Sequence, residues 1–491
     1  MGRAFGAAAI VALSLGVVGA SAAACSLTPL DGLTCSGSAC GDDAAGDGSL
    51  TEGEASVPDA NVESAPAPPI DPLGDGHWGS KHVSAQETVN AYSPLAGDVA
   101  AGASAVDIAV AGPFASGDLV LVWQTTSDVP FTGSGPKLDL SASPVGLYEI
   151  ARVTSLVPSG AGAHLQLSAP LGHAFVAAGA QVVRIAEYTD LTIDPGGIVA
   201  ADAWNGLAGG VVAVLVRGLL KVDGAITADG VGARGGITYT NSGPYNCGTS
   251  DGLLKDGYAA KGEGIVRSAY VASTAAGLAT GGRPSSTTGG GGGTCHNAGA
   301  GGGGNGSAGG QGGHDYDGSG VGRDVGGLGG LAMTFSVRER LVLGGGGGSG
   351  DRHAEVDTTG ARGGGVLLVR AHDLLAAGAI RADGAVGGPT NHDGAPGGGA
   401  GGTIALTVVG AATCSSPVSA NGGAGGSTTM SNVGPGGGGG GGHVMVKAGS
   451  GTCVPAAQSG LAGNQANPGA LSGKHYGAAP EAAVMGVIEA P

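Results

Sequence analysis

Apolar and polar residues alternate in short runs along most of the chain, and turn residues separate these runs. Within residues 77–190 the runs include GDLVLVWQT, LYEIARVTSLV and AHLQLSAPL. Alternation with a period of two is typical of β-strands that are buried on one face, and no helical spacing competes with it. We therefore predict an all-β domain over residues 77–190, built as a small β-barrel or sandwich.

A longer pattern repeats after residue 190. The phrases GGVVAVLVRG, GGVLLVRA, GGTIALTVVG and GGHVMVKAG each join a glycine pair to an apolar alternation. An Ala-Asp or Ala-Asn turn follows the first three, at spacings of 20, 19 and 20 residues (Gly210 to Gly230, Gly365 to Gly384, Gly402 to Gly422). A fixed period is the mark of a repeat architecture in which each unit buries its apolar face on its neighbours. We predict a β-solenoid-like repeat body over residues 191–463, followed by a C-terminal tail over residues 464–491.

Runs of four to seven glycines begin at Gly289, Gly301, Gly344 and Gly436, next to the apolar phrases. Such a run is expensive to order, because glycine loses more backbone freedom on folding than any other residue. One interpretation is a flexible linker. The other is a set of extended three-fold helices that pack backbone to backbone through amide hydrogen bonds. Strands and cysteines bracket the runs, and we therefore predict packed polyglycine segments within the repeat body.

The repeat also predicts a disulfide. Cys414 and Cys453 follow the glycine pairs of their phrases by 12 and 11 residues (from Gly402 and Gly442). In a stacked coil, equivalent residues lie about 4.8 Å apart, within the Cα range that a disulfide accepts. We expect Cys414 to pair with Cys453. Cys247 with Cys295 would then close the glycine-rich insertion over residues 237–362, and Cys35 with Cys40 a loop near the N-terminus. A zinc site is the alternative, but the chain has no C-x-x-C spacing.

Charge limits the class of partner. The formal net charge is −17, with only 21 Lys and Arg residues spread along 491 positions. Nucleic-acid binding needs a basic patch, and none is visible, so we expect no nucleic-acid partner. Part of the acidity is local, because residues 26–76 carry ten Asp or Glu and no Lys or Arg. This segment is too polar to bury a core, and we predict a disordered acidic tether.

The first 25 residues read as an export signal, with Arg3 ahead of the apolar run AAAIVALSLGVV. The end of this segment, ASAAAC, resembles the bacterial lipoprotein signal, which implies that Cys25 receives the lipid and becomes the new N-terminus. Ala22 departs from that pattern, and an A-x-A cleavage with plain secretion is the alternative. Ser26 and Leu27 lack the aspartate that retains such lipoproteins at the inner membrane, so the resemblance implies an outer-membrane or cell-surface location.

Two further resemblances concern the body. The phrases KGEGIV, GGGGGTCHNAGAGGGG and PGGGGGGGHVMV are similar to those of glycine-rich surface lipoproteins of gliding soil bacteria, of the adventurous gliding motility type. The polyglycine part also resembles the extracellular glycine-rich domain of the anaplastic lymphoma kinase receptor group, a ligand-binding module without catalysis. FASGDLVLV and YEIARVTSL resemble a small all-β module of bacterial and phage surface proteins. These likenesses imply a surface role and supply no catalytic residues.

A few polar residues suggest chemistry. Asp315, Asp317 and Asp324, with Ser319, place oxygen atoms where calcium could bind, although the pattern lacks the closing glutamate of a calcium loop. Asp229 and Asp383 suggest the paired carboxylates of sugar-cleaving β-helices, but both precede a turn glycine and fit a turn role. The remaining candidates show no recognised catalytic spacing and are expected at the surface: His82, Glu149, Arg152 and His173.

We therefore expect a lipid-anchored cell-surface protein that serves in structure or adhesion and has no catalytic activity. Its partners would be the membrane, through the lipid, and envelope proteins or surface glycans, with no cofactor beyond a possible calcium ion. The alternative is a polysaccharide-active β-helix enzyme, a lyase or hydrolase. A cleft of converging carboxylates would favour the alternative, whereas the low charge content of the repeats favours the first expectation.

Overall fold

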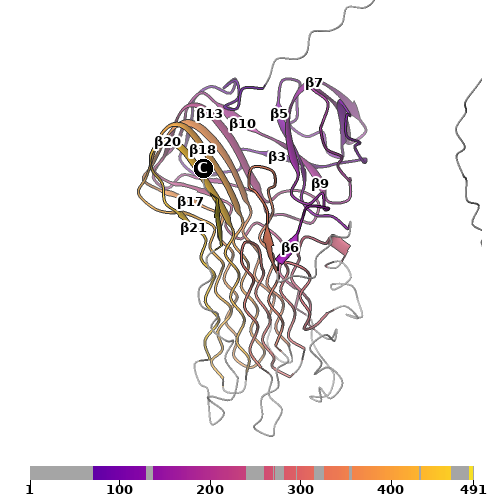
Figure 1. The fold of residues 1–491 in the computed structure, drawn as a ribbon, viewed down its shortest axis with the longest axis vertical. Helices are drawn as coiled ribbons and strands as arrows, with labels where there is room; N and C mark the ends of the chain where they lie inside the picture. The colour runs from indigo at the N-terminus through magenta and orange to yellow at the C-terminus, as the bar shows by residue number, and fades with distance from the viewer. Residues whose placement is uncertain are drawn as a thin grey trace, which may run out of the picture. The chain divides into compact units, whose positions relative to one another are not determined.

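The fold follows the two strand patterns of the sequence (Figure 1). The computed structural model describes residues 70–128, 137–238, 259–268, 270, 281–294, 296–314, 326–352, 357–430, 433–465 and 486–489. All of them belong to one unit, Pro66–Pro491. Several predicted site residues lie outside the described residues: Cys25, Cys35, Cys40, Cys247, Cys295, Asp315, Asp317, Ser319 and Asp324.

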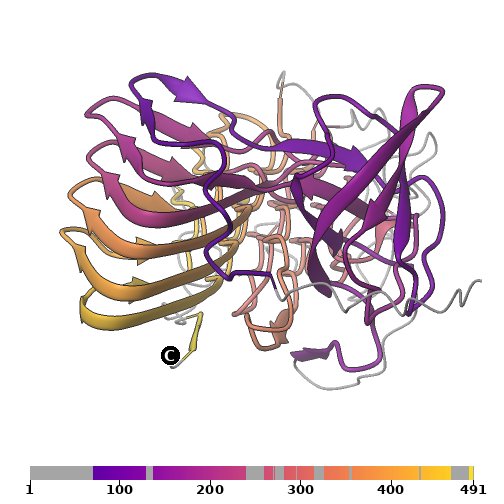
Figure 2. The same ribbon diagram turned by 90° about the horizontal axis from the view of Figure 1, so that it is seen from above.

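Two parallel sheets form the repeat body (Figure 2). The larger sheet contains β1 (Lys81–Val83), β11 (Leu191–Ile193), β13 (Val211–Val222), β16 (Val366–Ala376), β18 (Thr403–Cys414), β20 (His443–Thr452) and β22 (Val487–Glu489) in that order, with β10 (Ala186–Tyr188) also paired to β13. The smaller sheet contains β2 (Gln86–Glu87), β12 (Ile198–Ala200), β14 (Ala225–Thr227), β17 (Ala379–Arg381), β19 (Val418–Ser419) and β21 (Pro455–Ala456). Each turn of the chain adds one strand to each sheet, as in a β-solenoid.

The strand register matches the repeat seen in the sequence. The residues that follow the four glycine pairs, Val211, Val366, Thr403 and His443, are partners across β13, β16, β18 and β20. Apolar side chains between the two parallel sheets make the interior of the coil. The predicted repeat body is therefore confirmed, and its strands stack in the register of the glycine pairs.

An antiparallel six-stranded sheet forms the second part and curves into a half-barrel. It consists of β3 (Ala91–Pro94), β9 (Ala180–Arg184), β5 (Leu119–Gln124), β7 (Tyr148–Ser159), β8 (Gly162–Leu167) and β4 (Ala105–Ile108) in spatial order. The long strand β7 pairs with β5 through its first half and with β8 through its second half. The small β-barrel or sandwich expected from the alternating runs is thus an antiparallel half-barrel.

The border between the two parts differs from the sequence prediction. We placed residues 77–190 in the first domain, yet β1, β2 and β10 lie in the parallel sheets. Strand β1 pairs with β11, and β2 pairs with β12, so the chain starts the coil before it makes the half-barrel. Strands of two or three residues leave too little alternation to reveal their partners, and this is why the sequence did not separate them.

The glycine runs pack as three-fold extended segments, which Figure 1 shows side by side below the sheets. In the run that begins at Gly344, the amides of Gly344 and Gly347 donate to residues 364 and 361, those of Gly345 and Gly348 to residues 304 and 301, and those of Gly346 and Ser349 to residues 263 and 260. Every third amide thus faces the same neighbour, as in a three-fold helix. The packed interpretation of the runs is confirmed, and the linker interpretation is wrong for the described glycines.

The larger parallel sheet is covered on its inner face and on part of its outer face. Its inner face packs toward the smaller sheet. Part of its outer face packs against the half-barrel, where Trp123 and Leu121 meet Leu215 and Leu368. A parallel pair, β6 (Lys137–Asp139) with β15 (Ala332–Thr334), lies beside the same apolar cluster. Among the described residues, no helix is long and apolar enough to cross a membrane.

Candidate functional site

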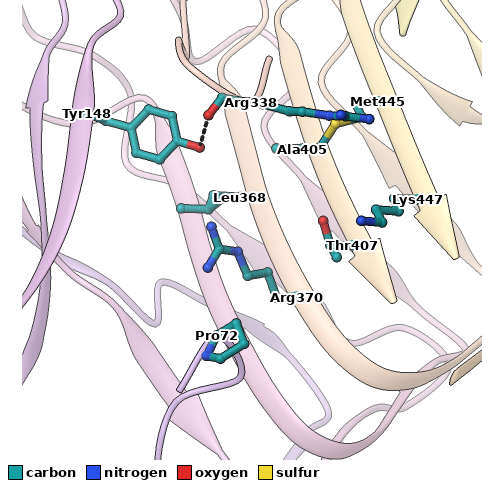
Figure 3. Close-up of a pocket in the computed structure, with 9 residues that line it drawn as sticks. All are labelled: Pro72, Tyr148, Arg338, Leu368, Arg370, Ala405, Thr407, Met445 and Lys447. Carbon is teal, nitrogen blue, oxygen red and sulfur yellow. Dashed lines mark hydrogen bonds between the residues drawn. The ribbon is translucent and has the colours of Figure 1, made fainter. Parts of the chain in front are cut away.

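A groove lies where the outer face of the larger parallel sheet emerges beyond the half-barrel (Figure 3). Its volume is about 250 Å³, and nine residues line it: Pro72, Tyr148, Arg338, Leu368, Arg370, Ala405, Thr407, Met445 and Lys447. Three of these residues are basic and none is acidic. We call this feature the cationic groove.

Strand register builds the groove. Arg370, Thr407 and Lys447 are direct partners on β16, β18 and β20, so they form one row across the sheet. Two residues earlier, Leu368, Ala405 and Met445 form a buried apolar row on the same face. The apolar row continues the packing against the half-barrel, and the polar row begins where that cover ends. The groove therefore has an apolar floor at one side and cationic side chains at the other.

Two neighbouring elements close the groove. Tyr148 at the start of β7 donates a hydrogen bond from its hydroxyl group to the carbonyl oxygen of Arg338, at 3.1 Å. This bond holds the aromatic ring beside the Arg338 backbone, while the exposed Arg338 side chain extends from there toward Met445 (Figure 3). Arg370 is half-buried and Lys447 is exposed, and within the described residues neither makes an ion pair or a side-chain hydrogen bond. Two positive charges of the groove are therefore available to an anion.

Asp229 and Asp383, the carboxylates that suggested sugar cleavage, lie on adjacent coils. The Asp229 carboxylate accepts a hydrogen bond from the amide of Asp383 (2.8 Å) and forms an ion pair with Arg381 (3.0 Å). Asp383 in turn accepts from the amide of Asn421 (2.6 Å) and from the Ser419 hydroxyl (3.1 Å). The Asn421 side chain continues the series to the next coil, by accepting from the amide of residue 458. These side chains form a ladder that holds successive turns together, which agrees with the turn role.

The surroundings of Asp383 nevertheless shift its pKa. Burial raises the pKa of Asp383 above its usual value, and the neighbouring charge of Asp229 adds to this, while the hydrogen bonds from Asn421 and Ser419 act against it. A half-buried carboxylate beside a second one that is paired with a cation is a pattern seen in enzymes that cleave glycosidic bonds. Structural networks show the same pattern, and here both oxygens of Asp383 accept hydrogen bonds from the next coil.

Arg152 belongs to a cluster that joins the parts of the fold. Its guanidinium group donates to both oxygens of Glu187 (3.0 and 2.7 Å), whose side chain is fully buried. Asp75 lies 3.1 Å from Arg152 and 2.5 Å from the His77 ring. Asp75, His77 and Glu187 come close enough together to hold a metal ion. Arg152 already neutralises Glu187 in a bidentate pair, however, and we interpret the cluster as a structural bridge between β7 and β10.

The other candidates from the sequence lie apart from one another. Glu149 accepts hydrogen bonds from the amides of residues 172 and 173 and contacts the His173 ring at 2.8 Å, so it fixes a loop of the half-barrel. His82 is exposed and lies 3.6 Å from Asp194. The structure does not bring these residues into one site.

Sequence reasoning missed the cationic groove. A signal was present, because Arg370, Thr407 and Lys447 each follow the second glycine of a phrase by five positions (Gly365, Gly402 and Gly442). Arg338 and Tyr148 carry no such signal, since they come from segments outside the repeat. The groove therefore could have been found only in part from the repeat.

The fold and groove define an all-β protein in which a parallel coil is joined to an antiparallel half-barrel and a polyglycine bundle. No protein-family model and no curated protein matches this chain.

The solved structures that it distantly resembles include three phage tailspikes. The tailspike gp49 from Pseudomonas phage LKA1 is 14% identical with a TM-score of 0.16, and the match covers 34% of this chain and 31% of that one. The tailspike gp61 from Pseudomonas phage phi297 is 12% identical with a TM-score of 0.17, and the match covers 76% of this chain and 51% of that one. The tailspike gp54 of Acinetobacter baumannii bacteriophage AP22, solved in complex with a capsular saccharide, is 10% identical with a TM-score of 0.16, and the match covers 75% of this chain and 61% of that one. The chain spans less than two thirds of the length of each. A likeness this distant carries no functional conclusion.

Proposed function

We propose that this chain is a lipid-anchored cell-surface protein with a structural or adhesive role and no catalytic activity. The observation that supports the proposal most is the use of its charged groups. Asp229 and Asp383 hold successive coils together and Glu149 holds a loop of the half-barrel, whereas Arg370 and Lys447 of the groove are available to an outside partner. A groove that offers these two cations suits binding better than hydrolysis.

The location rests on the signal-like sequence that ends at Cys25 and on the disulfide in the body. Cys414 and Cys453 are joined, with their Cα atoms 4.7 Å apart, as the repeat register led us to expect. A structural disulfide is compatible with an oxidising compartment outside the cytoplasm. The resemblance to glycine-rich lipoproteins of gliding bacteria supports attachment to the envelope or to a surrounding matrix as the role.

Removal of the lipid-accepting thiol tests the anchor. We expect Cys25→Ala to leave the membrane fraction, or to accumulate unprocessed, because a protein without its acyl chains loses about 0.8 kcal/mol per buried methylene of membrane affinity. The measurement is fractionation of cells with detection of the protein. Cys40→Ala is the matched control and should stay with the membrane. Unchanged membrane association of Cys25→Ala would contradict the lipid anchor.

The second candidate function is a polysaccharide lyase or hydrolase. The raised pKa of Asp383 next to Asp229 is the observation that favours it. Cleavage would require Asp383 to reach a glycosidic bond, although its two oxygens accept hydrogen bonds from the next coil. Shortening of a polysaccharide by the purified protein, with loss of that activity in Asp383→Asn, would establish this candidate and refute the first.

A further inference from the structure

We infer that the cationic groove binds an acidic saccharide, whose carboxylate lies over Thr407 between Arg370 and Lys447. This inference deepens the proposed adhesive function and rests on it. It names the class of ligand, a glycan with uronate-type carboxylates, and the side chains that receive it.

The row geometry fits a single carboxylate. Neighbouring strands are about 4.8 Å apart, so the backbones of Arg370 and Lys447 are separated by two such spacings, about 10 Å. Thr407 lies between them in register. Figure 3 shows the Lys447 amine on the Thr407 side, whereas the Arg370 guanidinium group extends toward Leu368 and reaches over the short Thr407 side chain only after a change of rotamer. The guanidinium group of Arg370 offers a planar pair of donors that matches a carboxylate, and the Thr407 hydroxyl offers a further donor. Lys447 adds a point charge from the other side.

The apolar part of the groove suits the carbon-bearing face of a sugar ring. Leu368, Ala405 and Met445 form the buried floor, and the apolar surface open to a ligand comes mainly from the exposed Pro72 and from the half-buried Tyr148 ring at the edge of the groove. An inorganic anion would use the cations and leave this apolar surface wet. A saccharide with a charged group covers both surfaces at once, which is the usual arrangement of a ligand pocket with few polar anchors.

The size of the groove favours a segment of a polymer. Its volume of about 250 Å³ is below the roughly 300–1,000 Å³ of pockets that enclose a drug-sized ligand. A shallow groove of this kind contacts one part of a chain and leaves the rest free to continue along the surface. An extended acidic polysaccharide meets that requirement.

The test uses the purified full-length protein and immobilised polygalacturonate as the probe. We expect binding that weakens as salt is raised, because the contacts are ionic and partly exposed. The methyl ester of the same polymer lacks the negative charge and should bind at least about tenfold more weakly, the loss expected when a charge-assisted contact is removed. Equal binding of the ester would overturn the inference.

Variants locate the site. Arg370→Gln with Lys447→Gln should weaken binding by about tenfold or more. The matched control is Lys81→Gln with Lys221→Gln, which removes the same charge from the same sheet at cations that already pair with Glu87 and Asp223. An equal loss in this control would mean that general electrostatics, not the groove, binds the polymer, and the inference would fall.

A second test adds a negative charge to the groove and leaves both cations in place. Thr407→Glu places a carboxylate between Arg370 and Lys447, where it should occupy both cations and block polygalacturonate while the unfolding midpoint stays equal or rises. Retained binding in Thr407→Glu would contradict the inference.

Three other outcomes separate this inference from the proposed function. Groove-dependent binding to vesicles of phosphatidylglycerol, with none to polygalacturonate, would identify a lipid phosphate as the ligand and refute the saccharide. Absence of any glycan binding by a protein that is still lipid-anchored and surface-exposed would refute the saccharide and leave the anchor proposal standing. Shortening of polygalacturonate by the wild-type protein would refute the non-catalytic proposal, whether or not the groove binds.

Discussion

At the scale of single residues, glycine is required where two backbones touch. Gly302 lies inside the bundle, and a Cβ atom placed there would overlap the carbonyl oxygen of Gly438. That oxygen belongs to a neighbouring backbone, so it has no rotamer by which to move away. The amide of Gly302 also donates a hydrogen bond to the carbonyl oxygen of Gly310, at 2.9 Å, and this bond fixes the Gly302 backbone further. The backbone around Gly302 therefore leaves no room for the methyl group of an alanine.

We expect Gly302→Ala to destabilise the protein by at least about 3 kcal/mol, the upper range for overpacking a core. Gly388→Ala is the matched control, because Gly388 has open space around its Cβ position and an ordinary φ. The control should be neutral or slightly stabilising, since alanine restricts the unfolded chain. Urea denaturation of both variants measures the difference. Equal stability of the two variants would contradict the close packing of the glycine runs.

His443 is the second residue with a decisive environment. It is fully buried, and its ring stacks on Phe335 with the ring centroids 3.9 Å apart. Burial, with a smaller contribution from the charge of Lys137, lowers the pKa of His443 to about 3, although contact with the Met333 backbone acts the other way. The imidazole of His443 therefore stays neutral in the folded protein near pH 6.5, where the same side chain takes up a proton in the unfolded chain.

This shift makes stability depend on pH in a definite direction. The contribution of His443 is constant above about pH 6.5, where the residue is neutral in both states, and falls as pH drops because only the unfolded state binds the proton. Between pH 6.5 and pH 5 we expect a loss of about 2 kcal/mol of unfolding free energy from this residue. His443→Leu should show a correspondingly smaller loss in denaturant titrations at the two pH values. Identical pH dependence in the two proteins would show that His443 is not buried as described.

At the scale of elements, adjacent coils are tied covalently as well as by hydrogen bonds. The Cys414–Cys453 disulfide joins the ends of β18 and β20 across 39 residues of sequence. The pairing register of β18 and β20 shifts by one residue along the strands: Thr403 pairs with His443, 40 positions on, but Thr413 pairs with Thr452, 39 positions on. That one-residue shift is the reason that counts of 12 and 11 from the glycine pairs bring the two cysteines together.

Loss of this bond should free the last coil. The chain-entropy model gives about 3–4 kcal/mol for a loop of this length. We expect a reducing agent to lower the melting temperature of the wild-type protein and to leave the Cys414→Ala, Cys453→Ala double variant unchanged. Calorimetry with and without reductant measures this, and non-reducing mass spectrometry should find the linked peptide. Free thiols at both positions would contradict the pairing.

The strand pairing could be predicted from the sequence where a pattern repeats, and it could not be predicted for short strands that lie outside the repeat. The glycine pair before each long strand recurs, so it set the register of β13, β16, β18 and β20. Strands β1, β2 and β10 have no more than three residues, and β1 and β2 pair with segments more than a hundred positions away. The groove combines both cases, since its row of Arg370, Thr407 and Lys447 is repeated but its walls come from the half-barrel and from the segment around Arg338.

At the scale of the whole folded unit, the two faces of the larger parallel sheet contribute side chains to two hydrophobic cores. Alternate residues of β16 point into the coil and toward the half-barrel, so Val369 belongs to one apolar cluster and Leu368 to the other. The fully buried Glu187 on β10 adds a polar tie between the parts through Arg152 on β7. Unfolding of the larger sheet would expose both cores at once. Because both cores depend on this sheet, the coil and the half-barrel should unfold together.

The glycine bundle has a consequence for how this protein would look in solution. Its segments are ordered by hydrogen bonds to neighbours, yet their backbone conformation is the extended three-fold helix that unfolded chains also populate. Far-ultraviolet circular dichroism responds to backbone conformation and not to the packing around it. A spectrum of the intact protein would therefore contain a large signal that resembles random coil, although the residues that produce it are among the most tightly confined in the molecule.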